Sequence, residues 1–169
     1  KTHKIDFRGV MPTNLFGMND SYDLENSHVI PALIKKFHLA KISKKPIVEV
    51  WGSGNQKREF LYVDDAARAC VTVMNIPKKL YYKTTDPGSR FINIGSGAVI
   101  TIGSLAGMIA SIVGFKGDIV FNTNMPDGPP EKSCDSTRLN SLGWEPSLNL
   151  KKALELTYEH ALKNKQLSE

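Results

Sequence analysis

The hydrophobic positions of the chain recur with the period of a helix in three separate stretches. The first stretch follows Asn26 and Ser27, either of which can cap a helix. The second runs from a cap at Thr101 to a stop at Gly114, and the third closes the chain from Leu150 onward. The positions expected to be buried are Ile30, Leu33, Ile34 and Phe37, then Ile102, Leu105, Ile109, Ile112 and Val113, then Leu150, Ala153, Leu154 and Ala161.

Shorter runs of β-branched and aromatic residues predict strands between these helices. We expect the strands in residues 5–11, 47–51, 91–94 and 119–121. A further helix is expected from about Asp65 to Asn75, with Asp64 or Asp65 as its cap and Pro77 beyond its end. Residues 81–90 are polar and predict a loop. Strands that alternate with helices indicate a short, mixed α/β fold.

Residues 51–65 join a strand to a helix through the turn Gly52-Ser53-Gly54-Asn55, whose glycines tolerate positive φ angles. Trp51 precedes this turn and Arg58 follows it. An indole and a guanidinium held side by side suit an anionic, partly flat ligand, and a nucleotide diphosphate fits that description. A hairpin with a solvated basic tip explains the same stretch equally well.

The net charge of +5 and the isoelectric point near 9.2 suit a nucleic acid or a phosphorylated small molecule alike. The basic residues are scattered in pairs, and no nucleic-acid-binding motif occurs, so we expect no nucleic-acid partner. No apolar run approaches the ~18 residues of a membrane span, and the first residues lack the apolar core of a signal peptide. We therefore expect no membrane partner, and the 169 residues suit one domain.

The two cysteines, Cys70 and Cys134, stand far apart and lack the spacing of metal ligands. This arrangement predicts no metal site and favours a reducing compartment, so we expect a cytoplasmic protein.

Several motifs occur in a characteristic order along the chain. They are Pro12-Thr13-Asn14-Leu15-Phe16-Gly17, Asn26-Ser27-His28-Val29-Ile30-Pro31-Ala32-Leu33, Trp51-Gly52-Ser53-Gly54, Arg58-Glu59-Phe60-Leu61-Tyr62-Val63-Asp64-Asp65, Asn93-Ile94-Gly95-Ser96-Gly97, Pro126-Asp127-Gly128 with Lys132, and Leu142-Gly143-Trp144. Through them the whole chain resembles the C-terminal half of the GDP-L-fucose synthase family, within the extended short-chain dehydrogenase/reductases. The segment from Arg58 to Asp65 identifies only that superfamily, whereas the motifs around His28 and Asp127 are more selective.

The resemblance implies that residues 1–169 form a small mixed substrate-binding domain that lacks most of the Rossmann sheet. It implies a partner, the N-terminal Rossmann half of the same protein, which in this family carries the glycine-rich cofactor loop and the Ser-Tyr-Lys and cysteine catalytic groups. A strand so close to the N-terminus likewise suggests a piece of a larger protein. The complete enzyme would be a homodimer that uses NADPH to convert GDP-4-keto-6-deoxymannose to GDP-L-fucose, by epimerisation at carbons 3 and 5 and reduction at carbon 4.

The resemblance also implies roles for individual residues. His28 matches the histidine thought to act as general acid, and it lies near the cofactor. An imidazole suits this task, because its ordinary pKa of ~6.5 lets it hold and release a proton near neutrality. The residues that match the segment along the nicotinamide end of NADP are Pro12, Thr13, Asn14 and Leu15, and those that match substrate-binding positions are Lys36, Trp51, Arg58, Asp127 and Lys132. Lys36 stands where arginine is usual, and lysine does not make the same two-pronged contact.

Two other functions remain open at this point. A nucleotide-sugar 4-epimerase or dehydratase of the same superfamily would share the segment from Arg58 to Asp65. A non-catalytic module that uses its positive charge to bind nucleic acid or protein would instead bind with strong salt dependence.

Overall fold

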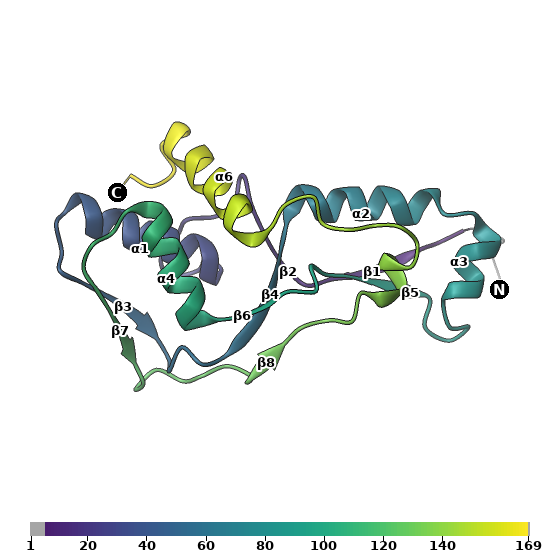
Figure 1. Ribbon diagram of the computed structural model, residues 1–169, viewed down its shortest axis with the longest axis horizontal. Helices are drawn as coiled ribbons and strands as arrows, with labels where there is room; N and C mark the ends of the chain where they lie inside the picture. The colour runs from purple at the N-terminus through teal and green to yellow at the C-terminus, as the bar shows by residue number, and fades with distance from the viewer. Residues whose placement is uncertain (1–5, 169) are drawn as a thin grey trace.

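Strand β4 (Lys57–Tyr62) crosses the middle of the molecule and connects its two ends (Figure 1). It pairs in parallel with β2 (Asn14–Phe16) and with β8 (Glu131–Lys132), and antiparallel with β6 (Val99–Thr101). This computed structural model describes residues 6–168. Its interleaved strands and helices confirm the predicted mixed α/β fold.

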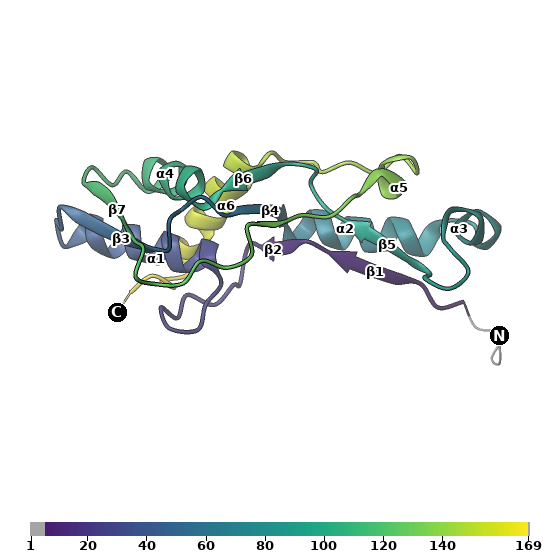
Figure 2. The same cartoon turned by 90° about the horizontal axis from the view of Figure 1, so that it is seen from below.

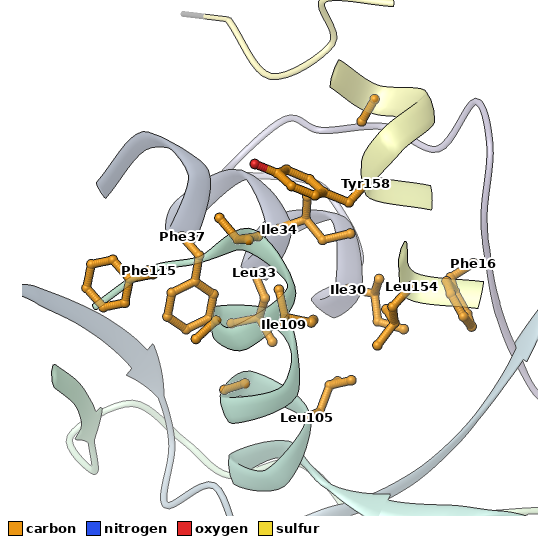
Figure 3. Packing of buried hydrophobic residues seen from close by; sticks show 14 of the residues in the cluster. Phe16, Ile30, Leu33, Ile34, Phe37, Leu105, Ile109, Phe115, Leu154 and Tyr158 are labelled. Carbon is orange, nitrogen blue, oxygen red and sulfur yellow. The ribbon is translucent and has the colours of Figure 1, made fainter. Parts of the chain in front are cut away.

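One end of the molecule is built on the parallel pair β3 (Ile47–Trp51) and β7 (Asp118–Asn122). Helices α1 (Val29–Ile42), α4 (Ile102–Val113) and α6 (Leu150–Lys163) pack together beside this pair. Their apolar faces meet in one hydrophobic cluster, part of which Figure 3 shows. Burying one large apolar side chain there stabilises the fold by about 1.5–3 kcal/mol. The most deeply buried members include Ile30, Ile34, Phe37, Leu105, Ile109 and Leu154.

The other end is built on the parallel pair β1 (Gly9–Pro12) and β5 (Phe91–Ile94). Helix α2 (Val63–Asn75) lies along this pair, as Figure 2 shows, and α3 (Lys78–Thr84) follows it. The short helix α5 (Thr137–Asn140) packs against β5. A second hydrophobic cluster fills this end and contains Leu61, Ala66, Ala69, Val73, Ile76, Tyr81, Ile92, Ile94, Leu139 and Trp144. Within residues 6–168, β1 pairs with no strand except β5, which leaves its outer edge open.

The boundaries of α4 confirm the signals read from the sequence. The Thr101 hydroxyl accepts a hydrogen bond from the Ser104 backbone N–H at 3.1 Å, which makes Thr101 the predicted cap. Gly114 ends the helix with φ +79°, a left-handed conformation that favours glycine. The strands predicted around residues 47–51, 91–94 and 119–121 are also confirmed. The first strand was expected from residue 5, which lies outside the described residues, and the described strand begins at Gly9.

The predicted cap of α1 is wrong. His28 occupies the N-cap position with an extended backbone, and its side chain does not cap the helix. Asn26 and Ser27 belong instead to a turn closed by Asp23, whose carboxylate accepts from the Asn26 N–H at 3.2 Å and whose carbonyl accepts from the Ser27 N–H at 3.0 Å. This local turn uses the polar groups before the helix begins, and it leaves the imidazole at the helix entrance.

The predicted cap of α2 is wrong as well. The helix begins at Val63, directly after β4, so Asp65 lies inside the first turn. The Asp65 side chain is 1% exposed and accepts hydrogen bonds from the Ser147 hydroxyl at 2.6 Å and from Arg68 at 2.6 Å. Burial raises the pKa of Asp65, but the hydrogen bonds from Ser147, Arg68 and Leu148 outweigh burial and lower that pKa below its ordinary value. The Asp65 carboxylate therefore binds Ser147, which is remote in sequence, instead of capping the helix.

Residues 81–90 were predicted to be a loop, and the first of them are helical. Tyr81 lies in α3 and is wholly buried in the second cluster. Its hydroxyl donates to the Arg90 carbonyl at 2.8 Å and accepts from the Gly9 N–H at 3.2 Å. The polar sequence around Tyr81 does not predict its burial, because that burial depends on strands far away along the chain.

Candidate functional site

A cavity of about 480 Å³ lies where the start of α1, the β3–β4 turn and the segment before β8 meet. Its volume is in the range of small-molecule sites. Apolar walls alternate with a few polar groups, an arrangement that fixes the orientation of a bound ligand. The lining residues are Thr13, Asn14, Leu15, Phe16, His28, Val29, Ile30, Pro31, Trp51, Gln56, Arg58, Phe60, Ile102, Pro126, Asp127 and Gly128.

The turn beside this cavity has the backbone that its residues predict. Gly52 and Gly54 have φ angles of +81° and +76°. The two strands that this turn joins do not pair with each other, because β3 pairs with β7 while β4 pairs with β2, β6 and β8. The hairpin interpretation is therefore wrong, and the turn lies at the edge of the cavity.

Trp51 ends β3 and presents its indole at the cavity with 55% of the residue exposed. The Lys36 Nζ lies 5.0 Å from the centroid of this ring, a cation–π distance. Lys36 also donates to the Glu49 carbonyl at 3.4 Å and is not among the cavity-lining residues. The structure therefore brings Lys36 to the site through its contact with Trp51.

Arg58 lines the cavity from β4, and part of its guanidinium is already engaged. Its Nη1 donates to the carbonyl oxygens of Lys57 at 2.7 Å and Pro129 at 2.8 Å. The register of β4 and β8 sets Lys132 directly beside Arg58, although Lys132 does not line the cavity. Two cations thus neighbour each other at one edge of the site, an arrangement suited to a phosphate group.

Asp127 lines the cavity from the other side of the turn. Its Oδ1 accepts from the Ser53 N–H at 2.8 Å and its Oδ2 from the Ser53 hydroxyl at 2.8 Å. The hydrogen bond from the Ser53 backbone, followed by that from its hydroxyl, holds the pKa of Asp127 below its usual range. Gln56, which is buried in the cavity wall, donates from Nε2 to the Ser53 hydroxyl at 3.3 Å.

The segment predicted to lie along the cofactor is held by the backbone of Glu59. The Thr13 hydroxyl and the Asn14 amide donate to the Glu59 carbonyl at 3.1 and 2.8 Å. Thr13, Asn14 and Leu15 line the same cavity as His28, whereas Pro12, the last residue of β1, does not.

The Glu59 side chain is fully buried and joins two further segments to β4. Its carboxylate oxygens accept from the backbone N–H groups of Gly97 and Cys134, each at 2.8 Å. Burial raises the pKa of the Cys134 thiol, and the carboxylate of Glu59 beside it adds to this rise. A thiol whose pKa is raised stays protonated, which favours a packing role for Cys134.

The structure thus gathers seven of the predicted site residues around one cavity and leaves three outside its lining. Those that line it are Thr13, Asn14, Leu15, His28, Trp51, Arg58 and Asp127, and those outside are Pro12, Lys36 and Lys132. Sequence reasoning missed Gln56 and Ser53, because single polar residues in a turn carry no periodic signal. The one indication in the sequence was their position: Ser53 lies between Gly52 and Gly54, and Gln56 lies between Gly54 and Arg58.

Residues 6–168 contain neither a cluster of metal-ligating side chains nor a helix that could span a membrane. In this part of the chain no group of three or more His, Cys, Asp or Glu side chains is arranged to hold a metal ion. Every helix in the same range falls short of the length and apolar character that a bilayer crossing requires.

Comparisons with known proteins agree with the resemblance seen in the motifs. Residues 1–96 match the model of the NAD dependent epimerase/dehydratase family. The chain is 47% identical to GDP-L-fucose synthase from Escherichia coli (strain K12), over 94% of this chain and 50% of that protein. It is 48% identical to putative GDP-L-fucose synthase 2 from Arabidopsis thaliana, over 96% of this chain and 47% of that protein. The chain therefore spans about half the length of the curated relatives it matches.

A solved structure shares the fold. The GDP-L-fucose synthetase from Naegleria fowleri bound to NADP superimposes with a TM-score of 0.79 at 28% identity, over 95% of this chain and 48% of that one. The expected fold class and the likeness to this group of enzymes are thereby confirmed.

Proposed function

Because the chain belongs to the NAD dependent epimerase/dehydratase family, we propose that it is the nucleotide-sugar-binding half of an NADP-dependent GDP-L-fucose synthase. The complete enzyme converts GDP-4-keto-6-deoxymannose to GDP-L-fucose by 3,5-epimerisation and 4-reduction. The single observation that carries this proposal is the meeting of His28, Trp51 and Arg58 at one cavity, from three separate elements. The curated relatives named GDP-L-fucose synthase support the choice of substrate.

The three side chains have complementary roles in this proposal. The Arg58 guanidinium donates charge-assisted hydrogen bonds to the diphosphate, each contributing about 1.5–3 kcal/mol. The Trp51 indole offers a flat apolar surface to the nucleotide sugar. Lys132 and Lys36 add positive charge next to Arg58 and Trp51, and Asp127 borders the same site.

His28 is the catalytic residue of this chain in the proposal. Its imidazole lies at the entrance of α1, not engaged as a helix cap, and it borders the cavity. During epimerisation it returns a proton to the enolate carbon of the sugar, on the face opposite to the base. The base itself belongs to the N-terminal half, so the fragment alone is expected to be inactive.

The segment from Thr13 to Leu15, which shares the cavity with His28, fits one end of an NADP molecule. Thr13 and Asn14 are held in place by the Glu59 carbonyl, and Leu15 adds an apolar wall at that end of the cavity. Pro12, the last residue of β1, directly precedes this segment. When bound, the cofactor supplies the hydride that reduces the ketone at carbon 4. This chain then contributes the surface against which the nicotinamide end lies.

The expected partner is the N-terminal Rossmann half of the same protein. The open outer edge of β1 supports this, since an unpaired strand edge is a ready template for another strand. Phe7, two residues before β1, and Met11, within it, are 74% and 55% exposed, and a partner packed there would cover this apolar surface. Homodimerisation of the complete protein and a cytoplasmic location stay predictions. The two free thiols, Cys70 and Cys134, are consistent with a reducing compartment.

A test of catalysis uses the chain joined to its N-terminal half. His28→Gln should abolish GDP-L-fucose formation from GDP-4-keto-6-deoxymannose and NADPH while leaving GDP binding intact, because glutamine does not exchange a proton near neutrality. His38→Gln is the matched control, since His38 forms a hydrogen bond with the Tyr158 hydroxyl and does not line the cavity. Unchanged fucose formation in the His28 variant would refute the proton-donor role.

A test of binding uses the chain itself. Titration with GDP and with an oligonucleotide at two salt concentrations should give a GDP response from Trp51 that survives added salt. Oligonucleotide binding without a GDP response would favour a basic binding module instead. Activity of the joined protein with a UDP-hexose and bound NAD, in place of the 4-keto-6-deoxy sugar, would favour a 4-epimerase.

A further inference from the structure

The loop that joins β7 to β8, residues 123–130, is attached to the β3–β4 turn at its middle. Asp127 and Ser53 make this attachment through the two hydrogen bonds of 2.8 Å described above, one to the backbone and one to the hydroxyl of Ser53. Figure 1 shows the two segments running close together below β3. The ends of the loop are tied separately, by the Gly52 N–H to the Asn122 carbonyl at 2.9 Å and by the Lys57 N–H to the Pro130 carbonyl at 2.8 Å.

The turn is shaped to receive the Asp127 carboxylate. Gly52 has φ +81°, and a Cβ at this position would collide with the Asp127 Oδ1. The Ser53 hydroxyl also accepts from Gln56 Nε2 at 3.3 Å, which orients it for donation to Asp127. The glycine therefore provides both the left-handed backbone and the space in which the carboxylate lies.

The same loop sets the position of Arg58. The Arg58 Nη1 donates to the Pro129 carbonyl at 2.8 Å. A Cβ on Gly128 would lie 3.0 Å from the Arg58 Nη2, so the backbone of the loop passes directly against the guanidinium. A displacement of residues 127–129 would therefore break these contacts and free the Arg58 guanidinium to move.

We propose that Ser53 and Asp127 form a latch that positions the 123–130 loop and, through it, the Arg58 guanidinium for binding a nucleoside diphosphate. The part concerning the ligand rests on the proposed function. In this proposal Asp127 acts as a positioning residue, because each of its oxygens is hydrogen-bonded to Ser53 and a carboxylate facing a diphosphate would repel it.

The latch is tested first without ligand, by amide hydrogen exchange of the chain measured by NMR. Asp127→Ala should speed exchange at the Ser53 N–H about tenfold and loosen residues 123–130. Asp127→Asn should keep most of the protection, because its amide oxygen still accepts from that N–H. Asp118→Asn removes an exposed carboxylate from β7, outside the loop, and serves as the control for lost charge. Unchanged Ser53 exchange in Asp127→Ala would overturn the latch.

The consequence for binding is tested with GDP by calorimetry on the same variants. Asp127→Ala should weaken GDP binding about fivefold, and the Ser53→Ala, Asp127→Ala double variant should bind no more weakly, since both changes remove one interaction. Asp127→Asn should bind within about twofold of the unaltered chain. If Asp127→Asn keeps the Ser53 protection but loses GDP affinity as Asp127→Ala does, the carboxylate contacts the ligand and the positioning role is wrong.

The two proposals fail in different ways. A chain that shows the expected exchange pattern but no response to GDP contradicts the proposed function, while the latch itself stands. A chain that binds GDP equally well with and without Asp127 contradicts the positioning role and leaves the proposed function standing.

Discussion

The ammonium group of Lys36 lies 5.0 Å from the centroid of the Trp51 indole ring. This contact joins α1 to the last residue of β3 and places a cation against the aromatic surface that borders the cavity. Lys36 is thereby connected to the site through Trp51. This connection does not need the two-pronged contact of the arginine that is usual at this position in the family that the chain resembles.

Replacement of Lys36 should affect GDP binding through the indole. Lys36→Met should weaken GDP binding about twofold to fivefold, because an exposed cation–π contact contributes about 0.5–1 kcal/mol. Lys36→Arg should bind at least as well as the unaltered chain, since a guanidinium stacks on the same ring. The measurement is a fluorescence titration with Trp51→Phe as the control that identifies the reporting indole. Equal GDP affinities for Lys36→Met and Lys36→Arg would show that the charge on residue 36 does not affect GDP binding through Trp51.

Arg58 should distinguish a diphosphate from a monophosphate. Arg58→Lys should weaken GDP binding about tenfold and GMP binding less, because lysine does not reproduce the fork that spans the Pro129 carbonyl and a phosphate. Calorimetry with both nucleotides measures this difference. Arg138→Lys, which alters an exposed ion pair with Asp86 away from the cavity, should bind both nucleotides normally. A proportional loss for GDP and GMP would speak against diphosphate recognition.

Glu59 should be important for stability because its buried carboxylate accepts two backbone hydrogen bonds. Glu59→Gln replaces one acceptor oxygen with a donor that faces the N–H of Gly97 or Cys134, which should lower the free energy of unfolding by about 1–3 kcal/mol. Urea denaturation measures the change. Glu131→Gln removes an exposed ion pair with Lys57 at 3.8 Å, and its amide oxygen can still accept from the Ser133 hydroxyl. This control should stay within about 0.5 kcal/mol of the unaltered chain.

Asp65 should make stability depend on pH in the acid range. Its pKa is lowered in the folded chain, so its contribution is complete above the unfolded pKa of about 3.9 and is lost as the pH falls through the folded value. Asp65→Asn should lower the free energy of unfolding by about 2 kcal/mol at neutral pH. The difference from the unaltered chain should shrink below pH ~4. The exposed neighbour Asp64→Asn is the control, and a difference that persists in acid would contradict the assignment.

Much of the fold was predictable because its signals are local. The α4 helix begins and ends where Thr101 and Gly114 indicate, since a capping hydroxyl and a left-handed glycine act on the residues next to them. The β3 strand and the Gly52-Ser53-Gly54-Asn55 turn follow in the same way from side-chain shape and backbone freedom. The site residues His28, Trp51 and Arg58 were singled out through motifs, and their meeting at one cavity agrees with that selection.

The wrong predictions share a different cause. Asp65 was expected as a helix cap and instead binds Ser147, and Tyr81 was expected in a loop and instead bonds to Gly9 and Arg90. In both cases the side chain forms hydrogen bonds with a distant segment, and such partners cannot be read from the residues next to it in the sequence. The assignment of Asp127 as a ligand residue stays a prediction, and the residue lines the cavity. Its hydrogen bonds to Ser53 likewise join distant segments, so the sequence did not indicate them.

The sequence alone determined the class of fold, the order of most helices and strands, and the family to which the motifs belong. These properties depend on residue spacing and on interactions within a few positions of the chain. Only the tertiary structure decided which residues share the cavity wall, that Lys36 lies on Trp51, and that Ser53 holds Asp127. These relationships join different elements of the chain, and their geometry exists only once the start of α1, the β3–β4 turn and the β7–β8 loop have packed together.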